Sequence, residues 1–107
     1  MTSFDDRKES FERKFAHDEE LRFKAMARRN KLLGLWAAER LGKAGTEATD
    51  YAKAVVLADF EEAGDGDVVR KVRGDLEAAG HAMTDAQLRS QMETLMIRAI
   101  EEIRSGT

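Results

Sequence analysis

The chain has 107 residues, of which 36% are charged, and it contains neither proline nor cysteine. This length indicates a single domain, and the absence of cysteine excludes disulfides and thiolate chemistry. The net charge of -3 argues against the basic surface of a nucleic-acid binder. No apolar run reaches the roughly 20 residues that span a bilayer, so we expect a cytoplasmic protein without direct membrane insertion.

The N-terminal residues carry three of the chain's five phenylalanines among many charges. Phe4, Phe11 and Phe15 would share one apolar stripe on a helix. Ordering a residue costs about 1–2 kcal/mol, whereas burying one phenylalanine returns about 1.5–3 kcal/mol, so this short helix would be marginal alone. The stripe either packs on the protein's own core or belongs to a partner. We favour a partner, and expect residues 1–17 to be a flexible partner-binding segment.

A hinge is expected at His17 and Asp18, because a second acidic helix start follows them. One uninterrupted helix from the N-terminus to Leu41 would be unusually long for a small domain. The sequence therefore predicts a segment over residues 1–17 and a helical bundle over residues 18–105.

The apolar spacing in the remainder of the chain predicts four helices and no strands. The expected helices are Glu19 to Leu41, Glu47 to Glu62, one that begins at Asp67 and is stopped by Gly80, and one that follows Thr84. Thr46 is expected to cap the second helix, and Thr84 with Gln87 forms a capping box for the last. The first helix is apolar on two sides, with Gly34 in a stripe of small residues. The predicted fold class is an all-α four-helix bundle.

Two polar features lie close to these apolar faces. Asp59 could be a buried carboxylate, which would need a donor such as an arginine, or a solvated residue in an acidic helix end, and we favour the solvated state. Arg22 and Arg29 lie on the side of the apolar stripe. They would pair with a carboxylate of another helix, such as Asp59, or meet a phosphate or an acidic group of a partner.

Motifs for catalysis or metal binding are absent from the sequence. Neither His17 nor His81 has a glutamate three residues earlier, and there is no phosphate-binding glycine loop or nucleophile elbow. We therefore expect no enzyme activity, no metal and no tightly bound cofactor. The local excess of positive charge is a candidate site for weak ATP or ADP binding, although a solvated face is the favoured interpretation. This candidate site comprises Arg22, Arg28, Arg29 and Lys31.

The stretch FERKFAHDEELRFKAMARRNKLLGLWAAERLG, from Phe11 to Gly42, resembles the zeta subunit family, the alphaproteobacterial inhibitors of the F-type ATP synthase. Shorter stretches near Tyr51, Asp59 and Arg70 are similar to that family too. The resemblance implies a four-helix bundle with a mobile N-terminal segment. That segment would become helical at a catalytic interface beside the central stalk and block rotation in the hydrolysis direction while permitting synthesis.

By matching position, the resemblance implies that the inhibitory residues are Phe4, Asp5, Asp6, Arg7, Glu9, Phe11, Glu12, Lys14 and Phe15. It implies a non-enzymatic inhibitor that binds the catalytic head and central stalk, is monomeric when free, and is peripherally membrane-associated through the synthase. A small helical nucleotide-sensing or scaffold subunit without strong inhibition stays open as the alternative.

Overall fold

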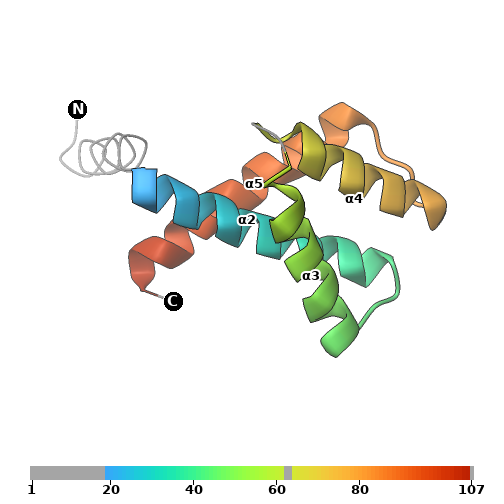
Figure 1. Cartoon of the computed structure of the whole chain (residues 1–107), viewed down its shortest axis with the longest axis horizontal. Helices are drawn as coiled ribbons and strands as arrows, with labels where there is room; N and C mark the ends of the chain where they lie inside the picture. The colour runs from blue at the N-terminus through green and yellow to red at the C-terminus, as the bar shows by residue number, and fades with distance from the viewer. Residues whose placement is uncertain (1–18, 62–63, 107) are drawn as a thin grey trace.

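The computed structural model describes residues 19–61 and 64–106, and this part of the chain contains four helices and no strand (Figure 1). The helices are α2 (Glu19–Arg40), α3 (Thr46–Ala58), α4 (Gly66–Ala78) and α5 (Asp85–Ser105). The predicted all-α fold class is confirmed. We call the described residues the helical body. The predicted segment over residues 1–17 lies outside them.

Helix α2 occupies the centre of the helical body. It contacts α3, α4 and α5, whereas α3 and α5 make no contact with each other in the described part of the chain. Figure 1 shows α3 crossing α2 obliquely, with α5 running past the other side of α2. A helix that is packed on two sides needs two apolar faces, and the two stripes predicted for α2 serve this purpose.

Side chains from all four helices form one continuous core. Leu33 of α2, Val55 of α3 and Leu76 of α4 are completely buried, as is Leu88 of α5. The remaining core side chains are mostly alanine and valine. The small residues bring α2 and α3 close together, and Gly34, in the stripe of small residues, lies against the backbone of α3.

Local sequence signals account for several helix ends. The chain leaves α2 through Gly42, which has a φ of 75°, and the backbone N–H of Lys43 donates to the carbonyl of Ala38 over 2.9 Å. At the start of α5, the predicted capping box is confirmed. The N–H of Gln87 donates to the Thr84 hydroxyl over 3.0 Å, and the N–H of Thr84 donates to the Gln87 side chain over 2.9 Å.

Three other helix ends differ from the prediction. Thr46 does not cap α3 but is its first helical residue, because Gly45, with a φ of 58°, occupies the cap position without a side-chain hydrogen bond. Helix α3 ends at Ala58 rather than at Glu62. After Ala58, the backbone N–H groups of residues 59–61 donate to carbonyls three residues earlier, which forms turns. Helix α4 begins one residue before Asp67. Asp67 is instead the second residue of α4, and its buried side chain accepts a hydrogen bond from the N–H of Val68 in the same first turn.

Candidate functional site

The predicted partner-binding residues, from Phe4 to Phe15, and the hinge at His17 and Asp18 all lie outside the described residues. The described chain starts at Glu19, the first residue of α2. The geometry available for a functional site is therefore that of the helical body, beginning with the surface next to this start. None of the described helices combines the length and apolarity that a membrane span requires.

Two exposed phenylalanines lie near the start of α2. The rings of Phe23 and Phe60 have centroids 6.0 Å apart and are tilted by 43°. Their exposed fractions are 58% for Phe23 and 63% for Phe60. Phe60 is exposed because α3 ends at Ala58 and the following turn carries the ring out of the core. Large exposed aromatic side chains are typical of surfaces that contact another molecule.

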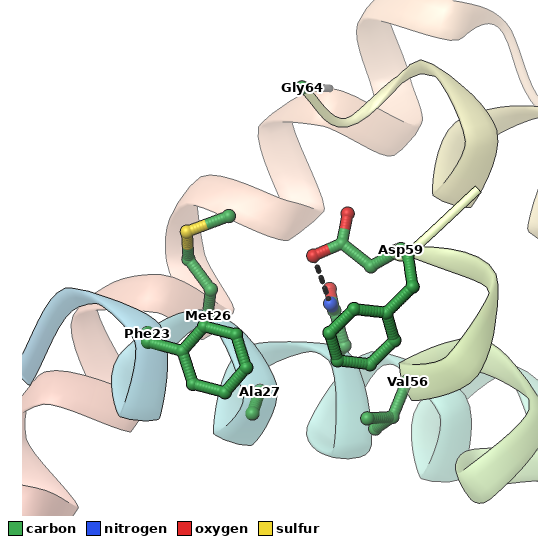
Figure 2. Close-up of a pocket in the computed structure, with 8 residues that line it drawn as sticks. Phe23, Met26, Ala27, Val56, Asp59 and Gly64 are labelled. Carbon is green, nitrogen blue, oxygen red and sulfur yellow. Dashed lines mark hydrogen bonds between the residues drawn. The ribbon is translucent and has the colours of Figure 1, made fainter. Parts of the chain in front are cut away.

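A cavity of about 200 Å³ lies beneath this aromatic pair, between α2 and the end of α3. Figure 2 shows Phe23 and Met26 on one side of it and Asp59 on the other, with Val56 below the carboxylate. The cavity thus joins an apolar wall to one acidic side chain.

Asp59 is held by an asparagine rather than by an arginine. The Nδ2 of Asn30, a buried residue of α2, donates to Oδ2 of Asp59 over 3.0 Å. The other oxygen, Oδ1, is buried and accepts no hydrogen bond from the described residues. The expectation of a solvated Asp59 is therefore wrong, because the carboxylate turns inward toward α2 once α3 has ended.

Arg29 pairs with the carboxylate of Asp65, in the connection between α3 and α4. Its two terminal nitrogens donate to the two oxygens of Asp65 over 2.8 and 3.2 Å, and its Nε donates to Oδ1 of Asn30 over 3.0 Å. The guanidinium is buried, with 5% of the side chain exposed. The predicted bridge from Arg29 to a carboxylate outside its own helix is present, but its partner is Asp65 instead of Asp59.

The pKa values of the two carboxylates near Arg29 are shifted in opposite directions. The pKa of Asp65 is lowered from its ordinary value of 3.8, chiefly by the hydrogen bonds from Arg29. The pKa of Asp59 is raised above that value, chiefly by burial, although the Asn30 hydrogen bond and the Arg29 charge both oppose the rise. This cluster links α2 to the end of α3 and the start of α4. Its hydrogen bonds connect these three helices to one another.

The candidate nucleotide-binding residues face different parts of the surface. Arg22 is exposed near the start of α2, Arg28 pairs with Glu102 of α5 over 3.3 Å, and Arg29 is occupied by its carboxylate. Arg22, Arg29 and Lys31 line three separate hollows. The structure therefore does not gather them around one phosphate position, and weak ATP or ADP binding stays a prediction.

Metal ligands are also not gathered in the described part of the chain, where no group of three histidines, cysteines, aspartates or glutamates could hold an ion. His81 is exposed in the connection that follows α4.

Comparisons with known proteins place the chain in a family. A search of the curated proteins found no match. A protein whose structure was determined by solution NMR is 52% identical to this chain, over 81% of this chain and 99% of its own length, with a TM-score of 0.71. The sequence profile of the family named ATPase inhibitor subunit zeta matches residues 1–102, a range that includes the predicted partner-binding segment. The chain belongs to the ATPase inhibitor subunit zeta family.

Proposed function

We propose that this protein inhibits ATP hydrolysis by the F-type ATP synthase. In this proposal, residues 1–17 fold into a helix at a catalytic subunit interface beside the central stalk and block rotation in the hydrolysis direction. The observation that carries the proposal is the match to an ATPase inhibitor family, which runs from residue 1 to residue 102 and so includes the inhibitory segment together with the helical body.

The helical body supports this division of the chain. Its core is continuous within the described residues, and every helix contributes fully buried side chains to it. In the proposal, the phenylalanine stripe of residues 1–17 serves as a set of anchors for a partner. Helices that fold on binding commonly insert such anchors, spaced by three, four or seven residues, into an apolar groove.

The charged residues of the segment would set its orientation in that groove. Asp5 and Asp6 suit the first turn of a helix, where the dipole favours negative charge. On such a helix, charged residues off the apolar stripe would pair with charges at the rim of the catalytic interface; they are Arg7, Glu9, Glu12 and Lys14. Inhibition requires no chemistry from the chain itself, so we expect no catalytic activity.

Truncation tests the proposal. A chain lacking residues 1–17 should keep the helical circular dichroism of the full chain and should lose inhibition of ATP hydrolysis by the purified catalytic head with its central stalk. The full chain should leave ATP synthesis by the intact enzyme unchanged. Equal inhibition by both chains would show that the inhibitory site lies elsewhere. Co-purification with the synthase without any effect on hydrolysis would instead support a scaffold subunit.

A further inference from the structure

An exposed groove runs between α2 and α3. It encloses about 650 Å³, and its walls are formed mainly by Leu35, Ala52, Val56 and Leu57. Leu35 is 37% exposed and Leu57 is 65% exposed, so the groove presents apolar surface to solvent. The core does not need these two leucines, because α2 and α3 already meet through smaller side chains below them. We call this surface the α2–α3 groove.

The charges that line the α2–α3 groove are all positive. Lys31 of α2 and Lys53 of α3 both line it, and no carboxylate does so among the described residues. Neither lysine forms an ion pair with another described residue. The protein as a whole carries a net charge of -3, so an apolar groove with only positive charges is a local departure from the rest of the surface.

We propose that the α2–α3 groove binds a helix of the ATPase that carries apolar side chains flanked by carboxylates. This inference rests on the proposed function, because it assigns a second contact with the same partner. The apolar side chains of such a helix would cover Leu35 and Leu57, and its carboxylates would pair with Lys31 and Lys53. The groove would then hold the helical body on the enzyme while residues 1–17 occupy the catalytic interface.

Charge complementarity argues against two other occupants. The chain's own N-terminal segment, residues 1–17, has four acidic and four basic residues, so its charges give no net attraction to the lysines. A second copy that used the same groove would bring the lysines of both copies together, because a two-fold interface pairs identical surfaces. An acidic helix of another protein avoids both difficulties.

A single substitution in the full-length chain tests the groove. Leu57→Glu places a negative charge in the centre of the apolar surface, and its high exposure makes the change compatible with folding, which circular dichroism would verify. The probe is the purified catalytic head with its central stalk, and the readout is the dissociation constant measured by biolayer interferometry. We expect binding to weaken roughly tenfold or more, as for a central interface anchor.

The matched control is Ile97→Glu. Ile97 is 61% exposed, close to the value for Leu57, but it lies on α5 outside the groove. This variant should change binding less than about threefold, as expected for a position outside the contact. A second pair compares Lys53→Glu with Lys43→Glu, which lies beyond the end of α2. Only Lys53→Glu should slow association, and that effect should diminish at high salt.

The outcomes separate this inference from the proposed function. Equal binding by wild type and Leu57→Glu would overturn the groove contact and leave inhibition by residues 1–17 standing. A wild-type chain that binds without inhibiting, and whose binding Leu57→Glu weakens, would overturn the proposed function alone. A smaller sedimentation coefficient of free Leu57→Glu would assign the groove to a second copy. Altered NMR signals of residues 1–17 in free Leu57→Glu, absent from Ile97→Glu, would assign it to the N-terminal segment. Either of these last two results overturns the proposal.

Discussion

Gly34 and Ala52 bring the backbones of α2 and α3 almost into contact. A Cβ atom added to Gly34 would lie 2.5 Å from the Cα of Ala52, which is nearer than real Cβ atoms come to other atoms. The backbone of a helix cannot move aside as a flexible side chain can. Position 34 therefore determines how closely the two helices pack.

We expect Gly34→Ala to destabilise the protein by about 1–3 kcal/mol, because the extra methyl group would force α2 and α3 apart. Gly74→Ala is the matched control, since Gly74 also lies within a helix but a Cβ there would meet nothing within 4 Å. That control should stabilise the protein by about 0.5–1 kcal/mol, through the better helix propensity of alanine. Urea denaturation of both variants measures the difference, and equal effects would contradict the close-packing argument.

Neutralising each of the two carboxylates near Arg29 by mutation to asparagine should change the stability of the protein in opposite directions. Asp65→Asn should lower the free energy of unfolding at neutral pH by about 1–3 kcal/mol, because it leaves the buried guanidinium without its charged partner. Asp59→Asn should raise that free energy, since it removes a charge that burial disfavours while the new side-chain carbonyl can still accept from Asn30.

The control for this pair is Asp85→Asn, which removes the partner of Arg89 in an exposed ion pair. It should change the free energy of unfolding by less than about 1 kcal/mol. Chemical denaturation at pH 7 distinguishes the three variants. A loss of stability in Asp59→Asn equal to that in Asp65→Asn would mean that burial does not dominate the environment of Asp59.

The pH dependence of stability follows from the same two groups. The pKa of Asp65 is lower in the folded chain than its ordinary 3.8. Its ionised form therefore stabilises the fold above pH 3.8, and this stabilisation is lost as the pH falls through the folded pKa. The pKa of Asp59 is raised in the folded chain. Its protonated form therefore stabilises the fold below pH 3.8, and this stabilisation is lost as the pH rises through the folded pKa. Asp65→Asn should therefore flatten the acid limb of the stability curve.

Asp59→Asn should have a different effect on that curve. It should remove a gain in stability that the wild type shows as the pH falls from neutral toward 3.8. Urea titrations at a series of pH values would follow both variants. Curves that are parallel to that of the wild type would indicate that neither carboxylate changes its pKa on folding.

The phenylalanine stripe should matter for inhibition and not for folding. Phe11→Ala and Phe15→Ala should each weaken binding to the catalytic head by about 1–4 kcal/mol if the rings are interface anchors. The melting temperature of the free protein should stay unchanged. Ile97→Ala serves as the control because it removes an exposed apolar side chain of the helical body. A fall in melting temperature with unchanged inhibition would show that the phenylalanines pack on the protein's own core.

Features set by neighbouring residues could be predicted from the sequence. The capping box of Thr84 and Gln87 depends on residues only three positions apart, and it is present. Periodicity likewise identified the helices and the two packed sides of α2. Gly34 lies in a stripe of small residues in the sequence, and the structure shows that this stripe faces α3.

Features that depend on distant residues could not be predicted in this way. The sequence pattern cannot show that Asn30 reaches Asp59, or that the arginine pairs with Asp65 across 36 positions of sequence. The exposure of Phe60 depends on where α3 ends, and no stop residue near Ala58 indicates that end in the sequence. The residues of the α2–α3 groove are also separate in sequence, and each of them alone resembles an ordinary surface or core position.

The central position of α2 has a mechanical consequence. Residues 1–17 precede this helix in the sequence, so under the proposed function a load placed on them by a turning rotor would enter the helical body through α2. A helix at the edge of a bundle could peel away under such a load and leave its neighbours folded. Because α2 contacts α3, α4 and α5, pulling it out would break its packing against all three of the other described helices. The helical body would therefore resist the load as one unit.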